Sequence, residues 1–358
     1  MFEILSSYLR NSGERKDLLI DAERNPSFEF ELYPDEVWFE VFLHCDRTSL
    51  YNASKVCRLF HSILATPKFW IEKCEQDKVE LPPVEWRKFC RREESKVNEE
   101  SVNKNQYTFN YRSIYHKNPY NRNLAHVIHS DSTIEELSRT HGYVFDHSGD
   151  GIIIEKEPVN CEKSSEVEVC FATSYEWCQR YFEIDLRKCG IEDWIMDRVR
   201  PTIIVRELSC CRRDCGAVYE FRAQLLQTSE LFDKNILLPR FRMISKTWEQ
   251  WQVDNSLLLL SILGGFSWEL SEHIFTEYPP GMRRIGIMSS GKDTQFWAGH
   301  YGAKFANTEV IVKFPEDIRL YNDDDFQDPK KEFIGPPHPR RRLHIPIGLR
   351  GRFLAHRF

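Results

Sequence analysis

The sequence predicts an α+β multidomain protein in which a small helical domain precedes an all-β domain. The chain has 358 residues, enough for roughly two domains of about 100 to 200 residues each. Residues 33–76 hold short apolar stripes at helical spacing. After Pro119 the chain carries short β-branched and aromatic runs separated by Gly, Asn and Asp turns, a pattern typical of a sandwich or barrel.

The N-terminal part begins with a polar lead and continues with dense helical signals. Residues 1–30 are mixed in charge without a sustained apolar period, so we expect a flexible lead. Pro34 then fits a first helical turn, and acidic residues follow it where the helix dipole favours them. A second proline, Pro67, opens a further short helix. Residues 31–78 therefore predict several short helices, which bury too little surface to be stable without a partner or a neighbouring element.

This helical segment resembles an F-box. The matching residues keep the family's order and spacing: Pro34–Val37, Val41, Phe42, Leu50, Ser54–Arg58, Phe60, Leu64, Phe69 and Trp70. The resemblance implies docking onto a Skp-type adaptor, and through it onto a cullin-RING ubiquitin ligase. The implied adaptor-binding residues are Tyr33, Pro34, Val37, Leu50 and Val56. An ordinary helical subdomain packed on the rest of the chain is the alternative.

The rest of the chain divides into a spacer, a β domain and a tail. Residues 79–117 are charged and begin with prolines, which predicts a helical linker. Residues 118–315 carry the predicted strands, namely 143–145, 152–154, 167–172, 203–205, 218–221, 284–288 and 310–312. The apolar insertion 248–263 is too short to be typed as strand or helix by its period. Residues 316–358, with an acidic run and a basic run, predict a disordered tail.

The β region resembles the F-box-associated domain of the sugar-recognising type. The matching residues are Asn118, Pro119, His147–Gly151, Glu155, Pro158, Phe171–Cys178, Ile184–Leu186, Pro201–Val205, Arg213, Asp214, Tyr219, Glu220, Thr276–Gly281, Phe296–Gly299 and Tyr301–Ala303. The resemblance implies a jelly-roll sandwich whose loops at one end bind the chitobiose core of N-linked glycans. It carries a site onto Tyr175, Asp214, Phe296 and Trp297.

The residue types at this site suit a sugar. Sugar rings have apolar faces and polar edges, so a lectin site needs exposed aromatic rings and a carboxylate or amide. Aromatic residues beside glycines are also common in β cores, and an aspartate on a turn often caps it. The sugar-binding relatives carry Tyr-Trp-Lys where this chain has Phe296, Trp297 and Ala298. The two lost hydrogen bonds, each worth about 0.5 to 1.5 kcal/mol, would weaken binding.

The two resemblances together imply a substrate-recognition subunit of an SCF-type ubiquitin ligase. It would direct glycoproteins with high-mannose N-glycans to ubiquitination and proteasomal degradation, including ER-associated degradation. The chain lacks a Gly-rich phosphate loop, a Gly-x-Ser-x-Gly elbow and an HExxH motif, so we expect a non-catalytic protein without a cofactor. The alternative function is an F-box scaffold whose β-sandwich binds a protein surface without glycan recognition.

The net charge and the cysteine content indicate which binding partners and which cellular compartment to expect. Lys and Arg number 49 against 55 Asp and Glu, a net charge of −6 that does not favour nucleic acid. The longest apolar stretch, 257–263, is far shorter than the roughly 20 residues that cross a bilayer, so we expect no membrane insertion. The 11 cysteines are unevenly spaced, and the cluster 210–215 lacks the partners of a zinc site. We therefore expect reduced thiols, no metal and a cytoplasmic location.

Overall fold

The computed structural model describes residues 33–97, 107–232, 240–249, 266–322 and 325–326. Three sequence-based predictions lie wholly or mostly outside these residues. They are the flexible lead 1–30, the insertion 248–263 beyond Glu249, and the disordered tail from Gln327 onward. The predictions for these segments stay predictions.

The N-terminal part is helical, as the sequence predicts. The helices of the described residues are α3 (Asp35–Leu43), α4 (Arg47–Ala53), α5 (Arg58–Ala65), α6 (Pro67–Gln76), α7 (Val84–Val97), α8 (Tyr111–Lys117), α9 (Ile134–His141) and the π-helix η2 (Ile195–Val199). Helix α4 starts where Asp46 accepts a hydrogen bond from the Ser49 amide at 3.2 Å. Helix α6 starts with Pro67 behind the cap residue Thr66. Local capping signals therefore place these short helices.

Aromatic side chains fill the interior of helices α3 to α6. The rings of Trp38 and Phe60 lie 4.6 Å apart, and Phe42 meets Phe60 edge-on at 4.9 Å. Lys73 is also buried, but its ammonium donates to the Leu43 carbonyl at 2.7 Å and pairs with Asp77 at 2.9 Å. Large rings thus supply the apolar area that helices of this length would otherwise lack.

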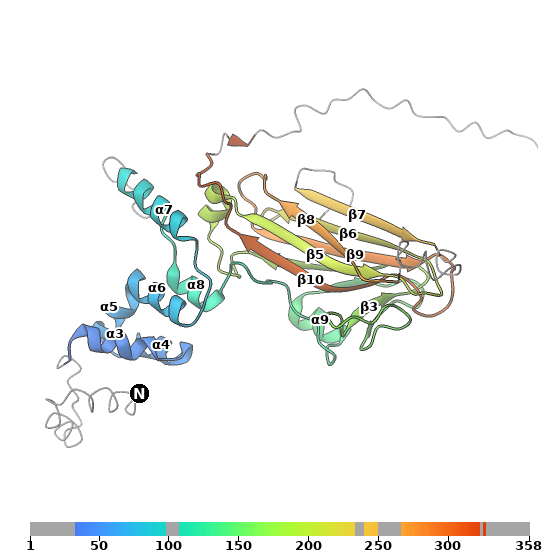
Figure 1. Ribbon diagram of the computed structural model, residues 1–358, viewed down its shortest axis with the longest axis horizontal. Helices are drawn as coiled ribbons and strands as arrows, with labels where there is room; N and C mark the ends of the chain where they lie inside the picture. The colour runs from blue at the N-terminus through green and yellow to red at the C-terminus, as the bar shows by residue number, and fades with distance from the viewer. Residues whose placement is uncertain (1–32, 98–106, 233–239, 250–265, 323–324, 327–358) are drawn as a thin grey trace, which may run out of the picture. The chain divides into compact units, whose positions relative to one another are not determined.

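Residues 144–313 form an antiparallel β-sandwich of two sheets (Figure 1). The strands are β1 (Val144–Asp146), β2 (Ile152–Glu155), β3 (Cys170–Thr173), β4 (Cys178–Asp185), β5 (Thr202–Cys210), β6 (Ala217–Leu226), β7 (Phe241–Trp248), β8 (Glu269–Phe275), β9 (Arg284–Asp293) and β10 (Lys304–Lys313). One sheet has the order β1-β4-β9-β6-β7 and the other β2-β3-β10-β5-β8. The sandwich confirms the predicted fold class, a helical part followed by an all-β part.

Two features of the β domain differ from the sequence prediction. The first is the presence of helices, namely the π-helix η2 and α9, which Thr133 caps at its start and Gly142 ends in the left-handed conformation with φ 70°. The second is that strands β4, β7 and β8 were not predicted. Their inward positions include polar residues, such as Arg180 in β4 and His273 in β8, so apolar and polar residues do not alternate clearly.

None of the helices in the described part of the chain combines the length and the apolar character that crossing a bilayer requires.

Candidate functional site

The loop between β9 and β10 is organised by one buried carboxylate. Asp293 is 2% exposed, and its side chain accepts hydrogen bonds from three successive backbone amides. These are Gln295 at 3.1 Å, Phe296 at 2.6 Å and Trp297 at 3.1 Å. Phe296 adopts a left-handed backbone with φ 60°, unusual for a bulky residue, and these hydrogen bonds hold it there. The loop therefore has a defined shape that its own backbone supports.

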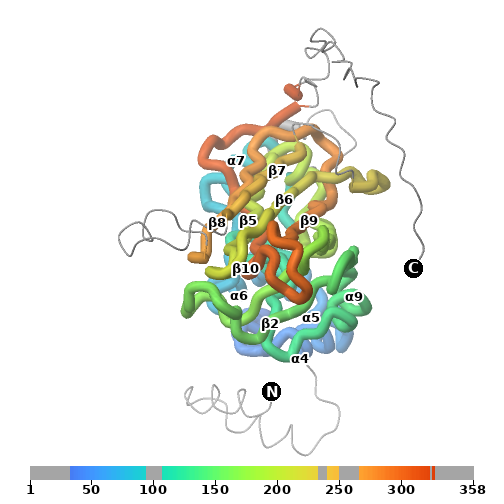
Figure 2. The backbone as a smooth tube through the Cα atoms, turned by 90° about the vertical axis from the view of Figure 1, so that its right-hand side faces the viewer, coloured from blue at the N-terminus to red at the C-terminus, as the bar shows by residue number. Residues whose placement is uncertain are grey.

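The far end of this loop is fixed by a neighbouring turn and by close packing. Asp150 accepts the Gly299 amide at 2.5 Å, and its own carbonyl lies 3.1 Å from a ring nitrogen of His300. A side chain at Gly302 would come within 2.8 Å of the Thr173 and Ser174 carbonyl oxygens. Glycine is thus required there for the loop to return against β3. Figure 2 looks onto this end of the sandwich, where the orange segment between β9 and β10 faces the viewer.

The loop presents two exposed aromatic rings, as the sequence predicts. Phe296 is 68% exposed and Trp297 is 40% exposed, whereas the aromatic residues of the strands are mostly buried. The Tyr175 ring meets Phe296 edge-on at 4.9 Å, so Tyr175 adjoins the same surface. The Tyr301 ring packs perpendicular to the Trp297 ring, with 5.5 Å between the ring centres. Two supported rings at an exposed loop form a surface on which a flat apolar face can stack.

The predicted carboxylate, Asp214, reaches this surface only through other residues. Arg212 binds both of its carboxylate oxygens, each at 2.8 Å. The same guanidinium lies over the Tyr301 ring, 4.2 Å from its centroid. The hydrogen bond from Arg212 holds the pKa of Asp214 below its usual range. Asp214 is therefore an ionised partner of Arg212, and the pair supports Tyr301 behind Trp297.

Sequence reasoning missed the residues that shape this surface. Asp293, Tyr301 and Arg212 act as supports, and none was predicted as a site residue. An aspartate directly before an irregular segment is a known capping signal and could have indicated Asp293. On β9, directly before Asp293, the Lys292 ammonium lies 5.4 Å from the centre of the Trp177 ring. Together with Phe296 and Trp297, we call the residues Tyr175, Tyr301, Arg212 and Asp214 the aromatic loop site.

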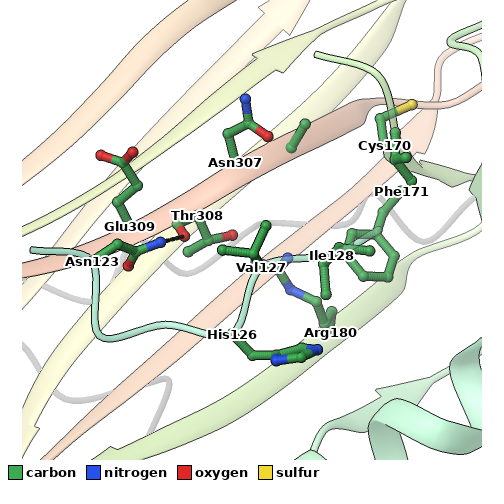
Figure 3. A pocket seen from close by; sticks show the side chains of 12 residues that line it. Asn123, His126, Val127, Ile128, Cys170, Phe171, Arg180, Asn307, Thr308 and Glu309 are labelled. Atoms are coloured by element: carbon green, nitrogen blue, oxygen red, sulfur yellow. Dashed lines mark hydrogen bonds between the residues drawn. The ribbon is translucent and has the colours of Figure 1, made fainter. Parts of the chain in front are cut away.

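A second feature of the sandwich is a cavity of about 240 Å³ beside β10 (Figure 3). It is lined by Asn123, His126, Val127, Ile128, Val169, Cys170, Phe171, Arg180, Ala306, Asn307, Thr308 and Glu309. Arg180 is only 1% exposed and pairs with Glu207, which is fully buried. Charge at the base of this cavity is thus already neutralised, so it offers no free ion for a ligand.

Glu207 is the centre of this buried polar cluster. It accepts hydrogen bonds from Tyr219 and Ser289, both at 2.6 Å, and from Arg180 and Thr308. These residues come from strands of both sheets. A fully partnered buried carboxylate of this kind joins the layers of the sandwich. We regard the cluster as structural.

The predicted adaptor-binding residues divide by exposure. Pro34 and Val56 are exposed, the latter by 55%, and Val37 is half-buried. Tyr33 and Leu50 are 6% and 1% exposed, and both belong to the helical core. Pro34, Val37 and Val56 are thus the residues with apolar surface left to offer a partner.

Comparison with known proteins identifies both parts of the chain. The family model described as "F-box associated region" matches residues 115–312, and the F-box domain model matches residues 34–72. "F-box only protein 6" of Bos taurus is 27% identical over 291 residues, covering 78% of this chain and 91% of that protein. "F-box only protein 17" of Homo sapiens is 26% identical over 313 residues, covering 81% and 94%.

Similarity to solved structures is weaker. The CBM22-1 xylan-binding domain of Paenibacillus barcinonensis Xyn10C is 7% identical, with a TM-score of 0.27 over 49% of this chain and 88% of that one. A family 11 carbohydrate-binding module of Clostridium thermocellum is 11% identical, with a TM-score of 0.23 over 51% and 96%. These scores are too low to support an argument about ligands.

Proposed function

Because the chain belongs to the family of proteins with an F-box-associated region and carries an F-box before it, we propose that it is the substrate-recognition subunit of an SCF-type ubiquitin ligase. In this role the F-box binds a Skp-type adaptor, and through it the cullin-RING ligase. The β-sandwich selects the substrate. The ubiquitin chemistry belongs to the partner proteins, so the chain itself is not an enzyme.

The substrate feature that the sandwich selects is the chitobiose core of high-mannose N-glycans. The observation that carries this proposal is the exposed pair Phe296 and Trp297 on a loop that Asp293 fixes. Acetamido sugars bind through stacking of their apolar faces on aromatic rings. The loop is already ordered by its own hydrogen bonds, so little conformational entropy is lost when a ligand binds. Glycoproteins selected in this way would be degraded by the proteasome, including through ER-associated degradation.

Polar contacts to the sugar come from this chain's own residues. Ala298 provides no cation beside Trp297, so the loop itself offers the sugar no positive charge at this position. The Asp214 carboxylate is 43% exposed where Arg212 binds it, and this pair adjoins the loop through Tyr301, so we assign to it the polar contact with a sugar hydroxyl group. We expect weak binding, because a shallow site with few hydrogen bonds gains little free energy beyond stacking.

A titration tests the glycan proposal directly. The full chain, in complex with a Skp-type adaptor, is titrated with chitobiose and compared with Trp297→Ala. Leu270→Ala serves as a matched control, because Leu270 is a large apolar residue that is 55% exposed on β8. We expect binding by the wild type and the control, and none by Trp297→Ala with an unchanged melting temperature. Absence of any response at millimolar chitobiose would refute glycan recognition.

A double substitution tests the adaptor end. Pro34→Ala with Val37→Asp places a charge in the apolar surface that the exposed part of the F-box offers, and should remove the adaptor from pull-downs. Val144→Asp is the control, because Val144 is 58% exposed on β1 in the sandwich. Unchanged recovery of adaptor with the double variant would contradict the assignment.

The alternative function, a scaffold that binds a protein surface without glycan, has one supporting observation. The edge strands of the sandwich expose large apolar side chains: Met243 on β7, and Leu270 and Ile274 on β8. Exposed apolar residues on sheet edges are common sites of protein association. Enzymatic deglycosylation of a captured target separates the two functions, since only glycan recognition is lost with the sugar.

A further inference from the structure

Two cysteines lie on the outer face of the sheet that contains β5 and β10. Cys210 on β5 pairs in register with Lys304 on β10, and Lys304 also pairs with Ala172 on β3. Cys170 lies two residues before Ala172, so it points to the same side of the sheet. Both thiols are buried, because the loop between β2 and β3 covers this face with Val167.

A third cysteine, Cys161, is held over this face by its chain neighbours. The Asn160 carbonyl accepts the Arg213 amide at 2.8 Å, just beyond the end of β5. On the other side, the Glu162 amide donates to the Phe266 carbonyl at 2.8 Å. Cys161 is therefore anchored from both directions while it remains half-buried. These two backbone contacts place Cys161 beside the end of β5, where it is the neighbour of Cys210.

The two thiols differ in their readiness to ionise. The hydrogen bond with Cys210 lowers the pKa of the Cys161 thiol, and the Lys304 ammonium acts in the same direction, although burial opposes both. Burial holds the pKa of the Cys210 thiol well above its usual range. A thiolate is the reactive form of cysteine. Cys161 is half-buried whereas Cys210 is fully buried, so an oxidant reaches Cys161 first, and its lowered pKa acts in the same direction.

The cluster suits oxidation better than metal binding. Lys304 is fully buried and pairs with Glu155, so a fixed cation already occupies the polar side of the cluster. Glu155 also accepts the Cys170 thiol at 3.7 Å. Across the described residues, no group of three potential ligands is arranged to hold a metal ion. The Lys304 ammonium lowers the pKa of the Cys161 thiol, and the paired Glu155 carboxylate acts in the opposite direction.

We propose that Cys161 and Cys210 form an oxidation site, at which hydrogen peroxide converts the two thiols into a disulfide. Both cysteines are free thiols in the structure, and the bond forms on exposure to the oxidant. It links the loop between β2 and β3 to the end of β5.

The reaction takes place in two displacements. The Cys161 sulfur attacks one peroxide oxygen, so that an S–O bond forms, the O–O bond breaks, and the leaving hydroxide takes a proton to become water. The Cys210 sulfur then attacks the Cys161 sulfur, forming the S–S bond as the S–O bond breaks. The departing hydroxide accepts the Cys210 proton. Two thiols and one peroxide thus give one disulfide and two waters.

Peptide mapping of the full chain tests this proposal. Protein purified with reductant is desalted, treated with hydrogen peroxide, alkylated and digested with trypsin without reduction. Cleavage after Lys156, Lys163, Arg206 and Arg212 releases Cys161 alone in peptide 157–163, and Cys210 with Cys211 in peptide 207–212. We expect a cross-linked pair of these peptides that dithiothreitol separates. Fragmentation of the pair assigns the bond to Cys210 or Cys211.

Two variants make the result decisive. Cys161→Ser should lose the cross-link and leave Cys210 reduced, whereas Cys189→Ser should form it as the wild type does. Cys189 is a matched control, since it is also half-buried but has a pKa that burial raises. A cross-link from Cys161 to Cys170 or Cys211, or oxidation of Cys161 to sulfinic acid with Cys210 unchanged, would overturn the proposal.

Discussion

Two buried carboxylates in the sandwich each accept several hydrogen bonds, but they stabilise different parts of the domain. Glu207 is fully buried and accepts from side chains of β4, β6, β9 and β10. Asp293 is 2% exposed and accepts from the backbone of the loop that follows it. Glu207 thus connects distant strands, whereas Asp293 shapes a local surface. The comparison teaches that burial of an acid does not reveal its role, but the origin of its donors does.

The largest expected effect is the loss of the buried pair. Glu207→Ala leaves the Arg180 guanidinium uncompensated in the interior, so the free energy of unfolding should fall by about 3 to 5 kcal/mol. Chemical denaturation of the full chain measures this. The control is Glu309→Ala, whose partner Arg206 is 37% exposed, and whose effect should stay below about 1 kcal/mol. Equal effects in the two variants would mean that Glu207 does not join the sheets.

Asp293→Ala should have a smaller effect on stability and a larger one on binding. Three backbone amides lose their acceptor, and hydrogen bonds to a charged group contribute about 1.5 to 3 kcal/mol. The loop can reach water once it is released, so we expect a loss of about 1 to 3 kcal/mol in the free energy of unfolding. Chitobiose binding should weaken at least about tenfold, which corresponds to about 1.4 kcal/mol. Unchanged binding would show that the loop keeps its shape without Asp293.

Ala298→Lys should give a modest gain. It places a cation directly after Trp297, and one added hydrogen bond contributes about 0.5 to 1.5 kcal/mol. Chitobiose should then bind roughly 2-fold to 10-fold more tightly, as measured by titration. Ala298→Gln provides a polar control of similar length without the charge. No change with lysine would mean that the loop directs this side chain away from the ligand.

Asp214→Asn should have the smallest effect, and one that depends on pH. Because Arg212 holds the pKa of Asp214 below its ordinary value of 3.8, the ion pair stabilises the fold above that pH and loses its contribution as pH falls through the lowered pKa. Asp214 is 43% exposed, which limits the effect to below about 1 kcal/mol. Wild type and variant should differ at neutral pH and converge in acid. A constant difference across pH would contradict an ionic role.

Local signals explain why the helices between residues 31 and 78 could be predicted, whereas α9, in spite of its caps, and several strands were not. Asp46 and Pro67 mark helix starts through contacts within one turn, so a short stretch of sequence contains the information. Strand β4 points Arg180 inward, and β8 points Ser271 and His273 inward. These side chains find partners on other strands, such as the Phe221 carbonyl that lies 3.0 Å from His273. These partners are present only in the assembled sandwich. The sequence of such strands therefore does not show the apolar and polar alternation that would predict them.

The residue types of the candidate site could be predicted from the sequence, but the contacts between these residues could not. Phe296 and Trp297 were predicted as exposed rings, and the structure exposes both. Asp214 was predicted as a carboxylate for the ligand, and sequence alone does not show that Arg212 binds it with both donors. The support of Trp297 by Tyr301 depends on how the loop turns back, which Gly302 decides by close packing.

The fixed ends of the loop also have a consequence for how such receptors diversify. Asp293 holds one end and Gly302 the other, and neither contact uses the side chains of residues 294–301. Side chains can therefore change at Gln295, Trp297 and Ala298 while these anchors stay in place, so recognition can diverge between related receptors without refolding, whereas Gly299, with φ 104°, and His300 belong to the far anchor. The same property makes residues 294–298 a natural region for randomised libraries, in which new recognition loops are selected on an unchanged framework.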